Sequence, residues 1–98
     1  MASSLKHAQF LVDDRLADAA RGDLDACYDL GMAYASGDAA TGIDLIEAHK
    51  WFNLAAVAGS SAAQACRSEI AEAMTAREIA TAQKAARAWL QLTSARAA

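Results

Sequence analysis

One short pattern of alanine and glycine occurs twice in this sequence, and it constrains the fold more than any other feature. The pattern Ala-x-x-Gly-x-x-x-Ala begins at Ala19 and again at Ala56, an offset of 37 residues (from 19 to 56). A glycine that ends a helix adopts a left-handed conformation at little cost, and an alanine four positions later lets the next helix pack closely. Offsets of this size are typical of arrays of helical hairpins. The recurrence therefore predicts pairs of helices that stack on one another.

The composition also favours helices. The chain of 98 residues contains no proline, and its commonest residue is alanine, the best helix former, with 28 occurrences. Apolar residues make up 55% and charged residues 21%, which is typical of a folded chain rather than a disordered one. A chain of this length has room for one domain. We therefore expect a single all-α domain.

Glycines and capping boxes mark the predicted helix ends. Gly22, Gly37 and Gly59 each follow an apolar periodic run, as glycines at helix C-termini do. In a capping box, the side chains of the first and fourth residues each bond to the backbone N–H of the other. Three pairs have this spacing: Asp44 and Glu47, Ser61 and Gln64, and Thr75 and Glu78.

These signals predict five helices, over about residues 4–20, 24–36, 45–58, 62–73 and 76 into the 90s. Residues 1–21 are expected to form an N-terminal capping helix, 22–59 one repeat, 60–92 a degenerate repeat with a C-terminal capping helix, and 93–98 a frayed tail. In the third helix, the apolar spacing places Phe52 in the core and Trp51 at the flank of the core stripe.

A longer series of positions resembles a known family. In chain order these are Ala26, Leu30, Gly31, Tyr34, Gly37, Asp44, Glu47, Ala48, Trp51, Phe52, Ala55, Ala56 and Gly59. Their order and spacing closely resemble the Sel-one-like repeat family, bacterial and eukaryotic relatives of tetratricopeptide arrays. Residues 74–89 resemble the terminal capping segment of short bacterial members. The resemblance covers about residues 19–90.

The resemblance implies an α-solenoid of antiparallel helical hairpins in a right-handed stack, which works as an adaptor or scaffold for other proteins. The chain departs from the family in residues 37–44, which are one residue longer than the usual loop, and in the second repeat, where Arg67 and Ser68 replace leucine and glycine. Arrays usually need about three repeats for stability. We therefore expect the first and last helices to act as caps, with a homodimer as one way to complete the core.

The outward face of the second helix is the candidate protein-binding surface, because the first helix of each hairpin lines the concave side of a superhelix. Its residues are Asp25, Asp29, Met32 and Ser36, and we expect Gln64 and Arg67 of the fourth helix to extend it. The alternative is an ordinary solvated face.

Two aromatic residues are candidates for self-association. Phe10 lies off the apolar stripe of the first helix, and Trp89 lies on a terminal helix that has one face without a successor. The alternatives are a singly exposed apolar residue at Phe10 and core packing at Trp89.

The charge is unevenly distributed. Residues 1–49 carry nine acids and three bases (−6), whereas residues 50–98 carry six bases and three acids (+3). This polarity favours head-to-tail contact or an asymmetric partner, and the alternative is scatter over solvated faces. The net charge of −3 gives no general electrostatic reason to bind nucleic acid.

No constellation of catalytic or metal-binding residues is recognisable. His7 and His49 lack neighbours at metal-ligand spacing, and Cys27 and Cys66 are not part of a CxxC motif. We therefore predict no catalytic site, no metal and no cofactor. We expect reduced thiols in the cytoplasm and no membrane span, because no run of about 20 apolar residues occurs.

The sequence thus predicts a module that binds a protein or peptide partner and has no catalytic activity. The alternative is a small self-associating structural or regulatory subunit of one assembly.

Overall fold

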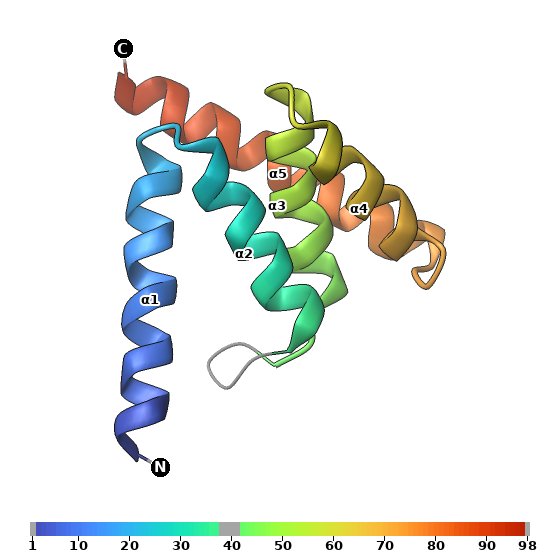
Figure 1. The fold of residues 1–98 in the computed structure, drawn as a ribbon. Helices are drawn as coiled ribbons and strands as arrows, with labels where there is room; N and C mark the ends of the chain where they lie inside the picture. Colours follow the sequence, from blue (N-terminus) through green and yellow to red (C-terminus); the bar gives the residue numbers. More distant parts are fainter. Residues whose placement is uncertain (1, 38–41, 98) are drawn as a thin grey trace.

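The structure, a computed structural model, is all-helical, as the sequence predicts. It describes residues 2–37 and 42–97, with side chains for 11–37 and 42–94, and contains no strand in these ranges. The helices are α1 (Ala2–Ala20), α2 (Leu24–Ser36), α3 (Leu45–Val57), α4 (Ser61–Ala71) and α5 (Ala76–Ala97) (Figure 1). The last helix extends to Ala97 and so includes most of the segment 93–98 that we expected to fray.

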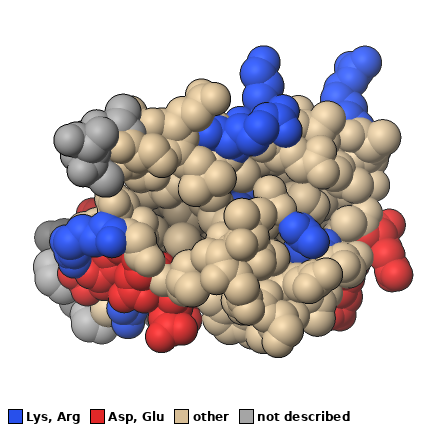
Figure 2. Space-filling model, turned by 90° about the horizontal axis from the view of Figure 1, so that it is seen from above, with Lys and Arg blue, Asp and Glu red and all other residues tan. Residues whose placement is uncertain are grey.

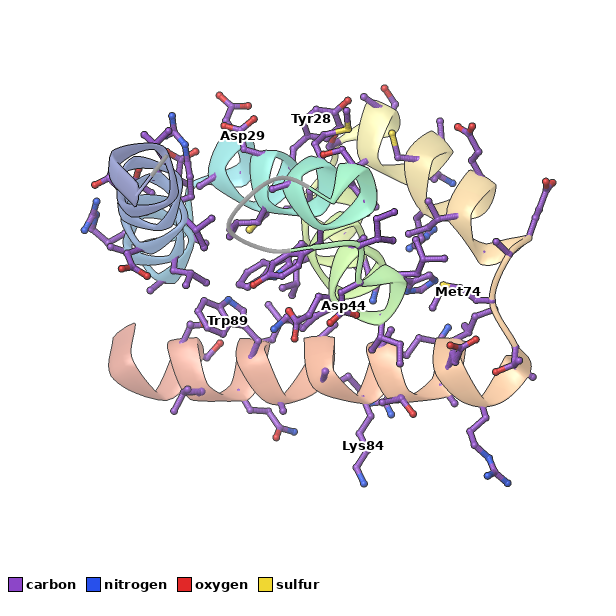
Figure 3. All side chains as sticks on the ribbon, turned by 90° about the horizontal axis from the view of Figure 1, so that it is seen from below. Tyr28, Asp29, Asp44, Met74, Lys84 and Trp89 are labelled. Atoms are coloured by element: carbon purple, nitrogen blue, oxygen red, sulfur yellow. The ribbon has the colours of Figure 1, made fainter. Side chains whose placement is uncertain are left out.

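Helix α3 is at the centre of the molecule. α2, α4 and α5 each pack against α3, whereas α1 packs against α2. α1, α2 and α3 lie side by side in chain order, and α5 runs along one side of the other helices (Figures 1 and 3). None of the helices, over the part of the chain described, is long and apolar enough to cross a membrane.

The turn between α1 and α2 is a Schellman motif centred on Gly22. The N–H of Gly22, whose φ is 91°, donates to the carbonyl of Ala19 at 3.0 Å. The N–H of Asp23 donates to the carbonyl of Asp18 at 3.1 Å. These two bonds satisfy carbonyl groups that the end of a helix otherwise leaves without partners.

The turn between α3 and α4 repeats this geometry 37 residues later. The N–H of Gly59, with φ at 116°, donates to the carbonyl of Ala56 at 3.0 Å. The N–H of Ser60 donates to the carbonyl of Ala55 at 3.0 Å. The predicted recurrence of helix-ending glycines is therefore confirmed in the backbone.

The residue after each glycine caps the following helix. The Asp23 carboxylate accepts from the N–H groups of Asp25 and Ala26, at 3.0 and 3.3 Å. Ser60 Oγ accepts from the N–H of Ala63 at 3.1 Å. The sequence prediction that Ser61 is the cap was wrong by one residue, because Ser60 has extended backbone whereas Ser61 is already helical.

Of the other two predicted capping boxes, one is complete and one is half formed. Thr75 and Glu78 bond reciprocally, at 2.8 and 3.1 Å. Asp44 accepts from the N–H of Glu47 at 3.1 Å, but the Glu47 carboxylate accepts from Trp51 Nε1 instead of reaching back. The N–H of Asp44 donates to the Tyr34 carbonyl, so it does not need the Glu47 side chain.

The core lies around α3. Its largest fully buried side chains are Trp51, Phe52 and Leu30. Trp51, predicted at the flank, is only 1% exposed because α5 covers it with Trp89, whose ring meets it edge-on at 4.9 Å between centroids. Helices α2 and α3 approach closely at Gly31, where an added Cβ would lie 2.6 Å from the Phe52 ring.

Candidate interaction surface on helices α2 and α4

The predicted stripe on α2 is exposed along its whole length. Asp25, Asp29, Met32 and Ser36 follow one another at spacings of four, three and four residues, so they lie on one side of the helix. All four are exposed, and Met32 retains 44% of its accessible area. An exposed thioether one turn from the Asp29 carboxylate offers a partner both apolar and charged contacts.

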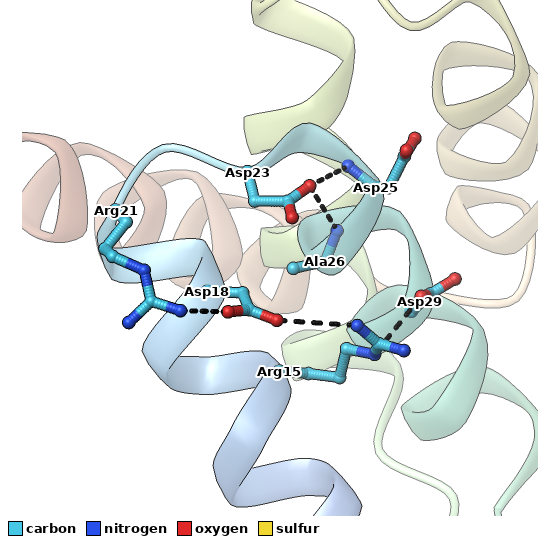
Figure 4. Close-up of polar contacts among 7 residues, drawn as sticks. All are labelled: Arg15, Asp18, Arg21, Asp23, Asp25, Ala26 and Asp29. Carbon is cyan, nitrogen blue, oxygen red and sulfur yellow. Dashed lines mark hydrogen bonds and ion pairs between the residues drawn. The ribbon is translucent and has the colours of Figure 1, made fainter.

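An ion-pair network holds one part of this stripe against α1 (Figure 4). Arg15 of α1 contacts Asp29 through Nε and Asp18 through Nη1, each at 3.4 Å. Arg21 also pairs with Asp18. The carboxylate of Asp29 is therefore oriented by α1, although the pair is too exposed to contribute much stability.

Helix α4 meets α2 on the side of the stripe where Tyr28 lies. The Tyr28 hydroxyl and Cys66 Sγ are 4.0 Å apart, and either group can donate. This hydrogen bond is the main reason why the pKa of Tyr28 is raised. Cys66 and Cys27 are both free thiols, and burial raises the pKa of Cys27.

The structure does not bring the two predicted α4 residues to the stripe. Gln64 is exposed, but it lies on the opposite side of α4 from Cys66, because residues two apart in a helix point in opposite directions. Arg67 is half-buried and donates to Asn53 of α3. Both residues therefore lie away from the side of α4 that contacts Tyr28, which the sequence could not show because it does not reveal how α4 is rotated about its own axis.

Two other residues of α4 take their place. Ala62 and Glu69 lie one turn before and after Cys66, so they share the side of α4 that faces α2, and both are exposed. We call the combined set the α2–α4 surface. It consists of Asp25, Tyr28, Asp29, Met32, Ser36, Ala62 and Glu69, and it contains three acidic side chains and no basic ones.

The side of the molecule opposite the α2–α4 surface is basic. Arg77, Lys84 and Arg87 of α5 are all exposed, and we call them the α5 basic stripe. In Figure 3, Lys84 points away from the body of the molecule, whereas Tyr28 and Asp29 lie on the far side from α5. Figure 2 shows basic side chains projecting along one edge and a group of acidic ones away from that edge, with further basic side chains beside the acidic group.

A pocket of about 310 Å³ opens between the α1–α2 turn and the C-terminal part of α5. Figure 2 looks down on this hollow. Its walls are largely apolar and include Leu24, Cys27, Leu54, Trp89 and Leu90. The sequence could not predict it, because its lining comes from four helices.

The two residues predicted for self-association have different outcomes. Phe10 lies outside the side chains that the structure describes. Trp89 is half-buried against Trp51, and Lys50 lies over both rings, 4.4 Å from the centroid of Trp51 and 5.8 Å from that of Trp89. Core packing is thus the main role that the geometry gives to Trp89, with one wall of the pocket as a second.

His49 is the one polar residue in the buried core of the described chain. It is 3% exposed, and its Nδ1 has no hydrogen-bond partner. Burial, and secondarily Arg67, lowers the pKa of its imidazole. Among the described residues, no group of three or more histidine, cysteine or acidic side chains could hold a metal ion.

Comparison with known proteins identifies no relative: no family model, curated protein or solved structure matches this chain.

Proposed function

We propose that this protein is an interaction module whose α2–α4 surface binds another protein, and that its role is binding rather than catalysis. The observation that carries the proposal is the exposed stripe of α2, in which Met32 lies between acidic side chains and Ser36 on one continuous face. Isolated exposed apolar residues are common, but a methionine one turn from both a half-buried tyrosine, Tyr28, and a carboxylate, Asp29, is a suitable contact for an amphipathic segment.

The fold that we propose is a short α-solenoid of the Sel-one-like kind. α1 with α2 and α3 with α4 form two antiparallel hairpins, and α5 closes one side. Support comes from the Schellman turns at Gly22 and Gly59, and from fully buried Ala26 and Ala63 at matching positions after them. Solenoids of this type present extended surfaces to proteins or peptides.

The chemistry of the surface suggests what the partner resembles. Asp25, Asp29 and Glu69 favour lysine or arginine side chains, and Met32 and Tyr28 favour an apolar side chain between them. A basic amphipathic helix or a basic extended peptide has this combination.

A photo-crosslinking experiment tests the proposal. A benzoylphenylalanine in place of Met32 should yield a reproducible adduct with one protein in the source cells. Charge reversal by Asp25→Lys and Glu69→Lys should remove that adduct. The matched control is the same probe at Val57, which is 68% exposed and lies outside the α2–α4 surface. Identical adducts from both positions would contradict the proposed surface.

A further inference from the structure

Two opposite faces of this molecule carry opposite charge. The α2–α4 surface presents the carboxylates of Asp25, Asp29 and Glu69, and the α5 basic stripe presents Arg77, Lys84 and Arg87. Figure 3 places them on opposite sides of the helices, with Asp29 and Lys84 pointing away from each other. Complementary patches of this kind steer association and fix its orientation.

The spacing of the basic residues on α5 is similar to that of the acidic residues on α2. Lys84 and Arg87 are three residues apart and therefore neighbours on the helix surface, as are Asp25 and Asp29, which are four apart. Arg77 precedes Lys84 by two helical turns, which is about 10.5 Å along the axis.

The α5 basic stripe also allows close approach. Ala80 lies between Arg77 and Lys84 and Ala88 follows Arg87, and both are exposed; such small side chains allow a neighbouring helix to approach closely. The α2–α4 surface contains one exposed alanine, Ala62. Two oppositely charged surfaces are thus available on every copy of the chain.

We propose that the occupant of the α2–α4 surface is a second copy of this chain, which contributes its α5 basic stripe. The proposal rests on the proposed function, because it names the partner of the same surface. The contact is heterologous, since the two surfaces lie on opposite faces of one molecule. Each added copy leaves one surface of each kind free, so the copies form an open chain or a closed ring rather than a two-fold dimer.

The first measurement is the mass of the purified full chain by sedimentation velocity at several concentrations and two ionic strengths. The mass should rise with concentration at about 0.01 M salt, where the Debye length is about 30 Å, and fall to the monomer at about 1 M, where it is about 3 Å. A stable dimer that is insensitive to salt, or a monomer under every condition, overturns the proposal.

Charge reversal provides the decisive test. One variant, Lys84→Glu/Arg87→Glu, reverses the charge of the α5 basic stripe, and the other, Asp25→Lys/Asp29→Lys, reverses that of the α2–α4 surface. The association constant of each should fall about tenfold or more, because each change replaces attraction with repulsion. Mixed in equal amounts, the two variants should associate again, since the now acidic α5 stripe of one fits the now basic α2–α4 surface of the other. The control is Asp14→Lys/Glu72→Lys, which changes charge at exposed positions outside both surfaces and should associate like the wild type.

The outcomes separate this proposal from the proposed function. If the mixture fails to associate while both variants keep the helical circular dichroism of the wild type, the head-to-tail contact is wrong. An adduct from position 32 with a different protein then leaves the proposed function standing. If position 32 yields no specific adduct and the chain is monomeric, both proposals fail.

Discussion

Helices α1 and α3 precede identical turns, yet they differ greatly in burial. α3 buries six residues, Ala48, His49, Trp51, Phe52, Leu54 and Ala55, because α2, α4 and α5 surround it. Of the α1 side chains that are described, only Val12 and Ala19 are buried, and α1 packs against α2. The local pattern determines how each helix ends, whereas the number of neighbours determines how much apolar area it removes from water.

The largest difference should appear when a large core side chain is removed from each helix. Phe52→Ala should lower the free energy of unfolding by about 3–5 kcal/mol, because it leaves a cavity inside the core. Val12→Ala in α1 should cost only about 1.5 kcal/mol, since it removes two methyl-sized groups at one edge. Urea unfolding monitored by circular dichroism measures both. Equal losses would show that α1 is as central as α3.

The close approach of α2 to α3 can be tested at Gly31. Gly31→Ala should destabilise the fold by about 1–3 kcal/mol, because the new methyl group overlaps the ring of Phe52. A smaller side chain should relieve this overlap, so the cost of Gly31→Ala should fall in a Phe52→Leu background. The control Ser36→Ala, at an exposed position of α2, should change stability by less than about 0.5 kcal/mol. If the losses of unfolding free energy from Gly31→Ala and Phe52→Leu simply add, the strain at position 31 does not come from the Phe52 ring.

Replacing the glycine of either Schellman turn should lower the free energy of unfolding by a similar amount, although the helices before the two turns differ in burial. Gly22→Ala and Gly59→Ala should each cost about 1–2 kcal/mol, because each puts a Cβ on a left-handed residue. At neither position would the Cβ meet an atom within 4 Å, so the cost is confined to the backbone. Paired chemical denaturation curves measure the two losses. A much larger loss at Gly59 would mean that burial around α3 amplifies turn strain.

Acidification should weaken the region around α3 through His49. Burial lowers the pKa of this imidazole in the folded state below its ordinary value of 6.5, so the unfolded chain binds the proton more readily. Stability is therefore retained above about pH 6.5 and lost as the pH falls toward the folded pKa. Arg67, which faces His49, also lowers the pKa of the imidazole. Glu47 and Lys50, on the same helix as His49, form an ion pair with each other and do not reverse the direction of this shift. In His49→Phe, the slope of unfolding free energy against pH over this window should disappear, and an unchanged slope would assign it to another group.

The smallest effect should come from the exposed link between α1 and α2. Arg15→Ala removes ion pairs to Asp18 and Asp29 and should cost about 0.2–1 kcal/mol, because both pairs are largely solvated. The loss should shrink at high salt. Thermal unfolding at two salt concentrations measures it. A loss comparable with that of Val12→Ala would show that charge, rather than packing, attaches α1.

The sequence was sufficient to predict those features of the fold that depend on interactions between residues close together in the chain. The glycine turns, the Thr75 box and three of the five helix starts, at residues 24, 45 and 76, follow from capping residues next to them, so they could be predicted without a structure. The α2 stripe could be predicted for the same reason, since one helical period determines which side chains share a face.

Contacts between segments that are far apart in the chain could not be predicted from the sequence. Trp51 was placed at the flank because nothing nearby shows that Trp89, 38 residues later, would cover it. Gln64 and Arg67 were placed on the surface, and Ala62 and Glu69 were missed, because the rotation of α4 follows from tertiary packing. The apolar pocket depends on four helices at once and leaves no linear signature.

The order of packing has a consequence for how the chain assembles during synthesis. α1 with α2, α2 with α3, and α3 with α4 are neighbours both along the chain and in space, so each can form as soon as the next helix leaves the ribosome. Such short-range topology favours rapid folding. α5 must reach back past α4 to α3, and until it does, the indole of Trp51 lacks the cover that Trp89 gives it. The nascent chain therefore exposes the Trp51 ring to solvent until α5 has been synthesised and has packed.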